Sequence, residues 1–247
     1  MTVTKIREAK CYEQFGQERC AILESCYADL PCAPRMTTQD SILLLGLAVA
    51  WLAYFIVHSV LASLMLKRRI SERWPGFVPY YRLTYNVLAV ILLLPVIALM
   101  RHAVGSPLWT WRGVGWWLTT AAALLAVAGF AWSLRYYDMG EFLGMNIRRQ
   151  SAEAGHFRIS PFHRYVRHPW YFFALIIIWT RAMEPAWLIS SVLISLYLVV
   201  GSRLEENKLV AVIGEPYRIY RQRVPALFPL PWRYLTQAEA LEMARPA

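Results

Sequence analysis

Five side chains that can ionise or bind a ligand lie at the ends of two consecutive apolar runs. Arg167, His168 and Tyr171 open the run in YVRHPWYFFALIII, and Glu205 and Glu206 follow the next run. The connection between the runs is short, which predicts an antiparallel helical hairpin with all five residues at one end. A glutamate buried there needs a cationic partner, and Arg167 is the nearest by topology. Two interpretations stay open at this point: an ion pair that only locks the hairpin, or a ligand site.

The combination of acid, base and aromatic ring at a lipid interface suits a zwitterionic cofactor and an amphiphilic substrate. His168 and Tyr171 are three residues apart, so both can face one pocket if the helix has begun. The sequence has no HExxH motif, no Walker A loop and no dinucleotide fingerprint. Gly113 and Gly115 form a lone GxG, which is a weak signal, and the topology puts it at the opposite end.

The apolar residues that would carry this hairpin are clustered into long runs. The chain has 247 residues, is 57% hydrophobic and contains 11 Trp. One run of 25 residues without formal charge is long enough to cross a hydrocarbon core of roughly 30 Å. We therefore predict an all-α, polytopic integral membrane protein with about five transmembrane helices plus C-terminal interfacial helices, rather than a soluble helical protein. The apolar runs are 42–66, 83–100, 114–134, 169–180 and 186–201.

The positive charge is distributed as a membrane protein would have it. The net charge is +10, and 18 of the 26 Lys and Arg fall in the three segments on one predicted side. By the positive-inside rule that side is cytoplasmic and the N-terminus lies outside. The predicted localisation is a bacterial inner membrane, with the site facing the cytoplasm. Nucleic-acid binding is not needed to explain the charge.

The first 35 residues differ from the rest and are expected to form a polar tail, 1–35, before a membrane domain, 36–247. The tail holds all four cysteines, with no CxxC and no nearby histidine, so a metal site is not predicted. Two disulfides, a disordered leader, and translation starting at Met36 all remain open. No cleavable signal peptide is expected, because the first apolar run starts too late and is too long. The cysteines are Cys11, Cys20, Cys26 and Cys32.

Two further patterns concern the predicted helices. After residue 203, Gly214 is placed to end a short helix, and Pro216 suits the first turn of another. Tyr217, Tyr220 and Val224 then form one apolar stripe of an interfacial helix. In the first membrane helix, His58 lies where a polar group is costly. For His58 we favour a neutral histidine bonded to a neighbouring helix over a ligand role.

The C-terminal half resembles a known methyltransferase pattern. RHPWY at 167–171, EENKL at 205–209, GEPYRIY at 214–220 and the VP dipeptide at 224–225 match RHPxY…EExxL…GxxYxxYxxxVP. This pattern is similar to that of the isoprenylcysteine carboxyl methyltransferase and phospholipid methyltransferase superfamily. The combination is specific, although RHP or EE alone would be weak. Many members have Gly shortly after the tyrosine, where this chain has Phe172 and Phe173.

The N-terminal half resembles one branch of that superfamily more closely. His58-Ser59, Tyr80-Tyr81-Arg82-Leu83 and Tyr85-Asn86 resemble bacterial methanethiol S-methyltransferases and the related NnrU-type membrane proteins. The resemblance runs from about residue 42 to 232 and leaves out the cysteine-bearing tail.

The resemblance implies an S-adenosylmethionine-dependent membrane methyltransferase. It implies that His168, Tyr171, Glu205 and Glu206 line the cofactor pocket. It also implies catalytic roles for Arg167, which would orient a carboxylate or stabilise the acceptor anion, and for Glu206.

The acceptor is expected to be a small or lipophilic molecule, and we favour a thiol. A thiol must be ionised, and a nearby guanidinium would lower its pKa below roughly 8.5. Isoprenylcysteine carboxyl and phospholipid head-group methylation stay open. So does a non-catalytic, haem-binding NnrU-like protein, with His58 and His102, or His156 and His163, as axial ligands. The oligomeric state is not predicted.

Overall fold

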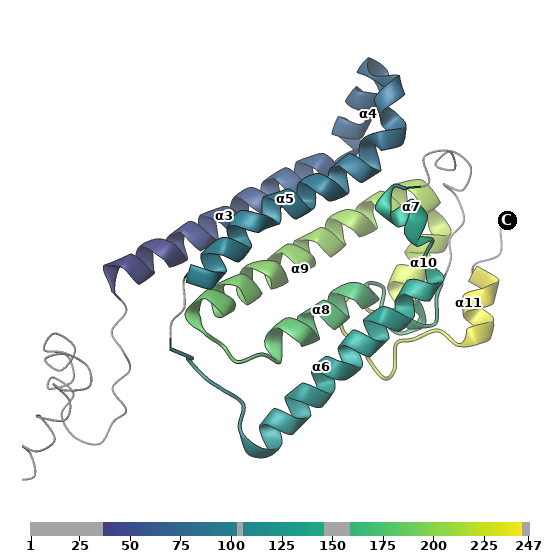
Figure 1. Ribbon diagram of the computed structural model, residues 1–247. Helices are drawn as coiled ribbons and strands as arrows, with labels where there is room; N and C mark the ends of the chain where they lie inside the picture. Colours follow the sequence, from purple (N-terminus) through teal and green to yellow (C-terminus); the bar gives the residue numbers. More distant parts are fainter. Residues whose placement is uncertain (1–36, 103–105, 146–158, 244–247) are drawn as a thin grey trace, which may run out of the picture. The chain divides into compact units, whose positions relative to one another are not determined.

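The computed structural model describes residues 37–102, 106–145 and 159–243. Within these ranges the chain is helical, with two isolated β-bridges and no strand. The cysteine-bearing tail lies outside the described residues, so the three alternatives for it, two disulfides, a disordered leader or a start at Met36, all stay open. The helices, labelled as in Figure 1, are α3 (Thr38–Ala62), α4 (Leu64–Arg73), η1 (Pro75–Tyr80), α5 (Tyr81–His102), α6 (Gly113–Ser133), η2 (Leu134–Tyr136), α7 (Met139–Leu143), η3 (Phe162–Arg164), α8 (Pro169–Trp179), α9 (Pro185–Ile213), α10 (Glu215–Arg223) and α11 (Gln237–Met243).

The chain is an all-helical, polytopic membrane protein, as predicted. Four helical segments of the described chain are long and apolar enough to cross a membrane: Thr38–Ala62, Pro75–His102, Gly113–Tyr136 and Pro185–Ile213. The fifth apolar run forms α8, which has only 11 residues. At 1.5 Å per residue this helix is about 16 Å long, roughly half of a hydrocarbon core. The run expected to form the fifth crossing is therefore a short helix, which packs against the long helices α6 and α9.

Helix α9 is the element that connects the two sides of the bundle. It contacts α3 and α10, and it also contacts α8, which packs on α6 (Figure 1). On the α3 side, the Trp51 indole donates a 2.9 Å hydrogen bond to Ser190 of α9. Leu47, Val96 and Ala186 complete a buried core there. Because α9 touches both sides, its residues are the ones that can join groups from α3 and α8.

Helix α9 is longer than the sequence suggests. Instead of a membrane helix ending near residue 201 and a separate short helix, 29 residues form one continuous helix. Gly214 ends it, as predicted, with a positive φ of 77° that favours glycine. Pro216 lies in the first turn of α10, also as predicted. The continuous backbone carries Glu205 and Glu206 beyond the apolar run without a break.

The predicted stripe on α10 is confirmed, and it packs against the protein itself. Tyr217, Tyr220 and Val224 are 3%, 2% and 0% exposed. They form one buried cluster with Leu235 and Ala240 of the C-terminal segment. The last part of the described chain is therefore fixed to the end of the bundle where α9 finishes.

Helix α7 is held against the start of α5 by polar contacts and a close approach. The Arg82 guanidinium binds the Glu141 carboxylate at 3.1 Å, and the Asn86 amide donates to two carbonyls at the end of α7. Gly144 follows with a φ of 82°. A Cβ at Gly144 would collide with the backbone nitrogen of Leu83. Only glycine fits both the backbone angle and the space.

A second close approach lies between α6 and α8. A Cβ added at Gly129 of α6 would lie 2.7 Å from the ring of Phe173, which is 7% exposed. Phe173 is one of the two phenylalanines that replace the glycine found in many members of the resembling superfamily. Here its ring fills the space above Gly129 and fixes the distance between the two helices.

Polar contacts hold His163 of η3 at both ring nitrogens and at its carbonyl. Its Nδ1 lies 2.6 Å from the Ser160 hydroxyl, its Nε2 lies 3.4 Å from the Tyr137 hydroxyl, and its carbonyl accepts a hydrogen bond from Tyr220. Burial lowers the pKa of His163 to about 4, and the neighbouring His168 acts in the same direction. The imidazole is therefore neutral near neutral pH.

We expect Gly144→Ala to destabilise the folded protein. The new methyl group would strain the positive φ and collide with the start of α5, at a cost of about 1–3 kcal/mol for the backbone conformation alone. The measurement is the midpoint of thermal unfolding in detergent. Gly76→Ala is the matched control, because a Cβ there meets nothing within 4 Å. Equal midpoints for the two variants would contradict the close approach.

The folded state should lose stability as the pH falls from 6.5 towards 4. In this window the unfolded chain binds a proton at His163, with a pKa near 6.5, and the folded chain does not. Above pH 6.5 neither state binds this proton, so His163 no longer favours the unfolded chain. We expect a lower unfolding midpoint in acid, and a flatter pH profile for His163→Asn, whose amide can still bond Ser160. If the variant keeps the wild-type slope, His163 is not the group responsible.

Candidate functional site

The structure brings together all five residues predicted from the sequence, at the end of the bundle where α8 begins and α9 ends. Arg167 and His168 lie just before α8, and Tyr171 is in its first turn. Pro169 occupies the first helical position, as predicted. The C-terminal segment runs along this turn, because the amide of Arg167 donates to the Pro225 carbonyl at 2.9 Å. The amide of His168 donates to the next carbonyl, that of Ala226, at 3.0 Å, so this segment holds the start of α8 in place.

A buried ion pair forms the centre of this site. The Arg167 Nη2 lies 2.7 Å from Glu206 Oε1, and both side chains are less than 10% exposed. The predicted partner of a buried glutamate is thus confirmed as Arg167. The Arg167 Nε donates to the same oxygen at 2.8 Å, and Nη1 donates to the carbonyls of Arg221 and Val224. Every nitrogen of this guanidinium has a partner, so the side chain is held in one position.

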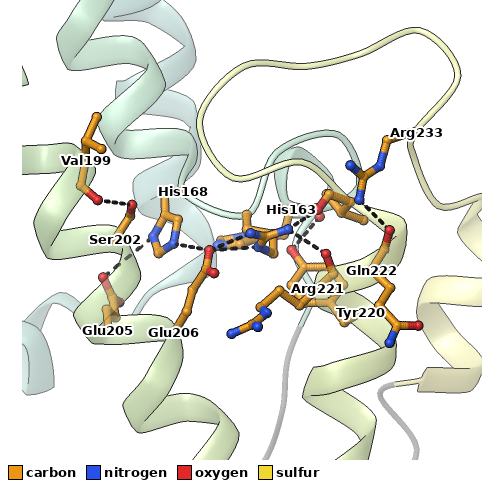
Figure 2. A network of polar contacts seen from close by, with 12 residues as sticks. His163, His168, Val199, Ser202, Glu205, Glu206, Tyr220, Arg221, Gln222 and Arg233 are labelled. Carbon is orange, nitrogen blue, oxygen red and sulfur yellow. Dashed lines mark hydrogen bonds and ion pairs between the residues drawn. The ribbon is translucent and has the colours of Figure 1, made fainter.

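His168 bridges the two glutamates, as Figure 2 shows. Its Nε2 lies 3.1 Å from Glu206 Oε1, and its Nδ1 lies 3.6 Å from Glu205 Oε2. A carboxylate oxygen only accepts hydrogen bonds, so His168 donates from Nε2 to Glu206. The imidazole is 7% exposed and stacks on the Tyr171 ring at 5.1 Å.

The two glutamates differ in what they can offer a ligand. Glu206 is 8% exposed in its side chain and is occupied by Arg167 and His168. Glu205 is 49% exposed in its side chain and accepts a 3.1 Å hydrogen bond from the Tyr171 hydroxyl. A half-exposed carboxylate beside an aromatic ring is accessible to a cation. Glu205 is therefore the acid that a bound ligand can reach.

Phenols surround the glutamates and keep their protons. Burial and the negative charge of Glu205 raise the pKa of Tyr137 to about 12. Burial raises the pKa of Tyr217 as well, and the charge of Glu206 adds to that effect. Protonated phenols donate hydrogen bonds, so this end of the bundle is rich in donors close to its carboxylates.

A cavity of about 490 Å³ opens beside the buried pair. Its volume lies within the range usual for small-molecule sites. Arg167 and Glu206 reach it, whereas His168, Tyr171 and Glu205 lie outside its lining. Its other lining residues are Val199, Ser202, Arg203, Asn207, Arg221, Ala226 and Leu227.

A larger cavity of about 740 Å³ lies at the opposite end of the bundle. It is lined by Trp111, Trp116 and Trp187, with Arg181 and Glu184 from the connection between α8 and α9. None of the residues predicted to carry chemistry reaches it. The lone GxG at the start of α6 lies at this end too, away from the five residues.

Sequence reasoning missed several members of the site. Tyr137 has no motif of its own and is recognised only by its nearness to Glu205. The carbonyls of Arg221 and Val224 carry no sequence signal, since every residue offers the same carbonyl. The link from Tyr220 to the carbonyl of His163 is invisible for the same reason.

His58 is bonded to a neighbouring helix, the role the sequence favoured. Its Nε2 lies 2.6 Å from the Tyr85 hydroxyl of α5. His102 is 17 residues beyond Tyr85 on the same helix, or roughly 26 Å along its axis. The pair His58 and His102 therefore cannot ligate one haem iron. His156, the proposed partner of His163, lies outside the described residues.

Known proteins of similar sequence share one activity in their names, the S-methylation of methanethiol. A methanethiol S-methyltransferase of Crocosphaera subtropica (strain ATCC 51142 / BH68) is 28% identical over 68% of this chain and 69% of that protein. Methanethiol S-methyltransferase 2 of Bradyrhizobium diazoefficiens is 29% identical over 71% and 69%. A methanethiol S-methyltransferase of Mycobacterium tuberculosis (strain ATCC 25618 / H37Rv) is 28% identical over 72% and 76%.

No solved structure matches the chain. A family model does match, over residues 41–224, and its description is "Protein of unknown function (DUF1295)". The matched range includes every helix from α5 to α10 and all five predicted site residues. The chain therefore belongs to the DUF1295 family.

Proposed function

We propose that this protein is an S-adenosylmethionine-dependent methyltransferase of the membrane that methylates a small thiol on sulfur. The names of its relatives support methyl transfer and a thiol acceptor. The observation that carries the proposal is the half-exposed Glu205 carboxylate, set among phenols beside the buried Arg167–Glu206–His168 network. The proposed location is a bacterial inner membrane, with this site facing the cytoplasm.

The donor set fits the cofactor. S-adenosylmethionine carries an ammonium group and a sulfonium, and its adenine is a flat aromatic surface. Glu205 can bind the ammonium, and the stacked rings of His168 and Tyr171 offer an aromatic face to a cation or to adenine. When bound, the cofactor supplies the methyl group. The protein's part is to hold acceptor and methyl donor in line, which provides much of the rate of a displacement reaction.

The geometry favours a positioning role for Arg167 over the catalytic role predicted for it. All of its donors are used by Glu206 and by two carbonyls. To meet an acceptor anion it would have to abandon a buried carboxylate, at considerable cost. The same applies to Glu206, which holds His168 in the orientation that stacks on Tyr171. We propose that these two residues orient the histidine and that Glu205 makes the ligand contact.

The other candidate acceptors are less well supported. The three relatives named above have methanethiol in their names, and none of those names refers to a prenylated peptide or a phospholipid. A haem-binding role is also less well supported, because His58 and His102 lie too far apart to ligate one iron. Thiol methylation is therefore the function to test first.

Glu205→Gln should weaken binding of S-adenosylhomocysteine at least tenfold. The substitution removes the accessible negative charge and keeps the size and the hydrogen bond from Tyr171. Calorimetric titration in detergent measures the affinity, and Glu215→Gln on the exposed surface of α10 is the control. Unchanged affinity in Glu205→Gln would remove Glu205 from the cofactor site. Failure of the well-folded wild type to bind would overturn the cofactor assignment itself.

Arg167→Lys should cost stability and cofactor affinity together. Lysine keeps the positive charge but has one nitrogen in place of the three that reach Glu206 and the two carbonyls, so contacts to the buried carboxylate are lost. Unfolding midpoint and S-adenosylhomocysteine affinity are the two measurements. Arg218→Lys, in an exposed pair with Glu215, is the matched control. A wild-type midpoint in Arg167→Lys would show that the pair does not support the site.

A further inference from the structure

A second polar cluster lies between α3, α5 and α9, within the membrane-spanning segments. The Tyr85 hydroxyl is 2.6 Å from His58 Nε2, and the Tyr197 hydroxyl is 3.3 Å from that of Ser59. The imidazole also stacks on Tyr54 at 5.4 Å. All of these side chains are only partly buried. Polar groups at this depth are costly and commonly mark a substrate or proton path.

An open strip of α9 leads from this cluster to the cofactor site. Tyr197, Gly201 and Glu205 are spaced by four residues, so they share one face, with steps of about 6 Å. A Cβ at Gly201 would meet nothing within 4 Å. The ring of His58 lies 6.1 Å from the ring of Tyr197, which is one helical turn before Gly201. Space and proximity thus connect His58 and Tyr85 with the Glu205 site.

A thiol acceptor needs a group that removes its proton. Thiolate, not thiol, is the nucleophile. The Arg167 guanidinium, which could have favoured the thiolate, is occupied by Glu206 and two carbonyls. His58 is the imidazole beside the open strip. The titratable side chains that contact it are phenols: Tyr54 from its own helix, Tyr85 from α5 and Tyr197 from α9.

We propose that the space beside Gly201 is the subsite for the small thiol, and that Tyr85 and His58 take up its proton. This rests on the proposed function. The thiol S–H bond breaks as its proton passes to Tyr85 Oη, and the phenol proton passes to His58 Nε2. The thiolate sulfur then bonds to the methyl carbon, whose bond to the donor sulfur breaks with the electron pair left on that sulfur. The positive charge of the sulfonium is replaced by that of the imidazolium, which later releases its proton to water.

Tyr85→Phe tests the proton path, since it removes the hydroxyl and keeps the ring. Purified protein would be assayed with ethanethiol and with the more acidic trifluoroethanethiol. We expect kcat to fall about 100-fold or more for ethanethiol. The fall should be at least tenfold smaller for the fluorinated thiol, which ionises without help. Affinity for S-adenosylhomocysteine should not change. Equal losses for both thiols, or no loss, would overturn the proposed proton path.

Gly201→Leu tests the subsite by binding alone. Protein saturated with S-adenosylhomocysteine would be titrated with ethyl methyl sulfide, the product of ethanethiol methylation. We expect binding to be lost in Gly201→Leu and kept in Val200→Leu, which adds bulk at a 52% exposed neighbour. Retained sulfide binding would overturn the subsite. Loss of S-adenosylhomocysteine binding would also overturn it, because the strip would then belong to the cofactor.

The two proposals fail in different ways. If the wild type neither binds S-adenosylhomocysteine nor methylates either thiol, the proposed function is wrong and the subsite falls with it. If the wild type does both, and Tyr85→Phe affects the two thiols equally, only the proton path is wrong.

Discussion

Two opposite charges are buried at the end of an apolar helix bundle, and neither is tolerable there without the other. Leaving one buried charge unpaired costs several kcal/mol, so the fold must place Arg167 and Glu206 in contact. Their 2.7 Å contact joins the start of α8 to the end of α9. It also fixes His168, which shares the same carboxylate oxygen. The position of every proposed ligand contact depends on this pair.

Helix α9 extends the effect of the pair to the other half of the bundle. One side of it carries Glu206 towards α8 and α10, and another carries Tyr197 towards Ser59 of α3. Near its end, the Lys208 ammonium donates to the Ala62 carbonyl at the end of α3. Helix α9 thus links the proposed cofactor contact, Glu205, to α3, the helix that carries the proposed proton acceptor His58. A break near Gly201 would have interrupted that link.

The features that could be predicted from the sequence are those set by strong local or electrostatic rules. A buried glutamate demands a cation, Pro169 suits a first helical turn, and Gly214 ends a helix. The continuity of α9 could not be read in the same way. Its apolar pattern stops near Gly201, yet Leu204, Glu205 and the residues that follow favour helix, so the backbone continues after the pattern has ended. Contacts to backbone carbonyls, such as those of Arg167, leave no trace in the sequence.

The partners of Arg167 also set an order in which the protein can be completed. The Arg221 and Val224 carbonyls come from the segment after the last membrane-spanning helix. During synthesis the chain emerges from its N-terminus, so α3 to α9 are made before those carbonyls exist. Until that segment is made, Arg167 has Glu206 available as a partner, but its Nη1 lacks its two carbonyl acceptors. A chain that ends before residue 224 would lack the Val224 acceptor of Arg167, and its proposed ligand site would be incomplete.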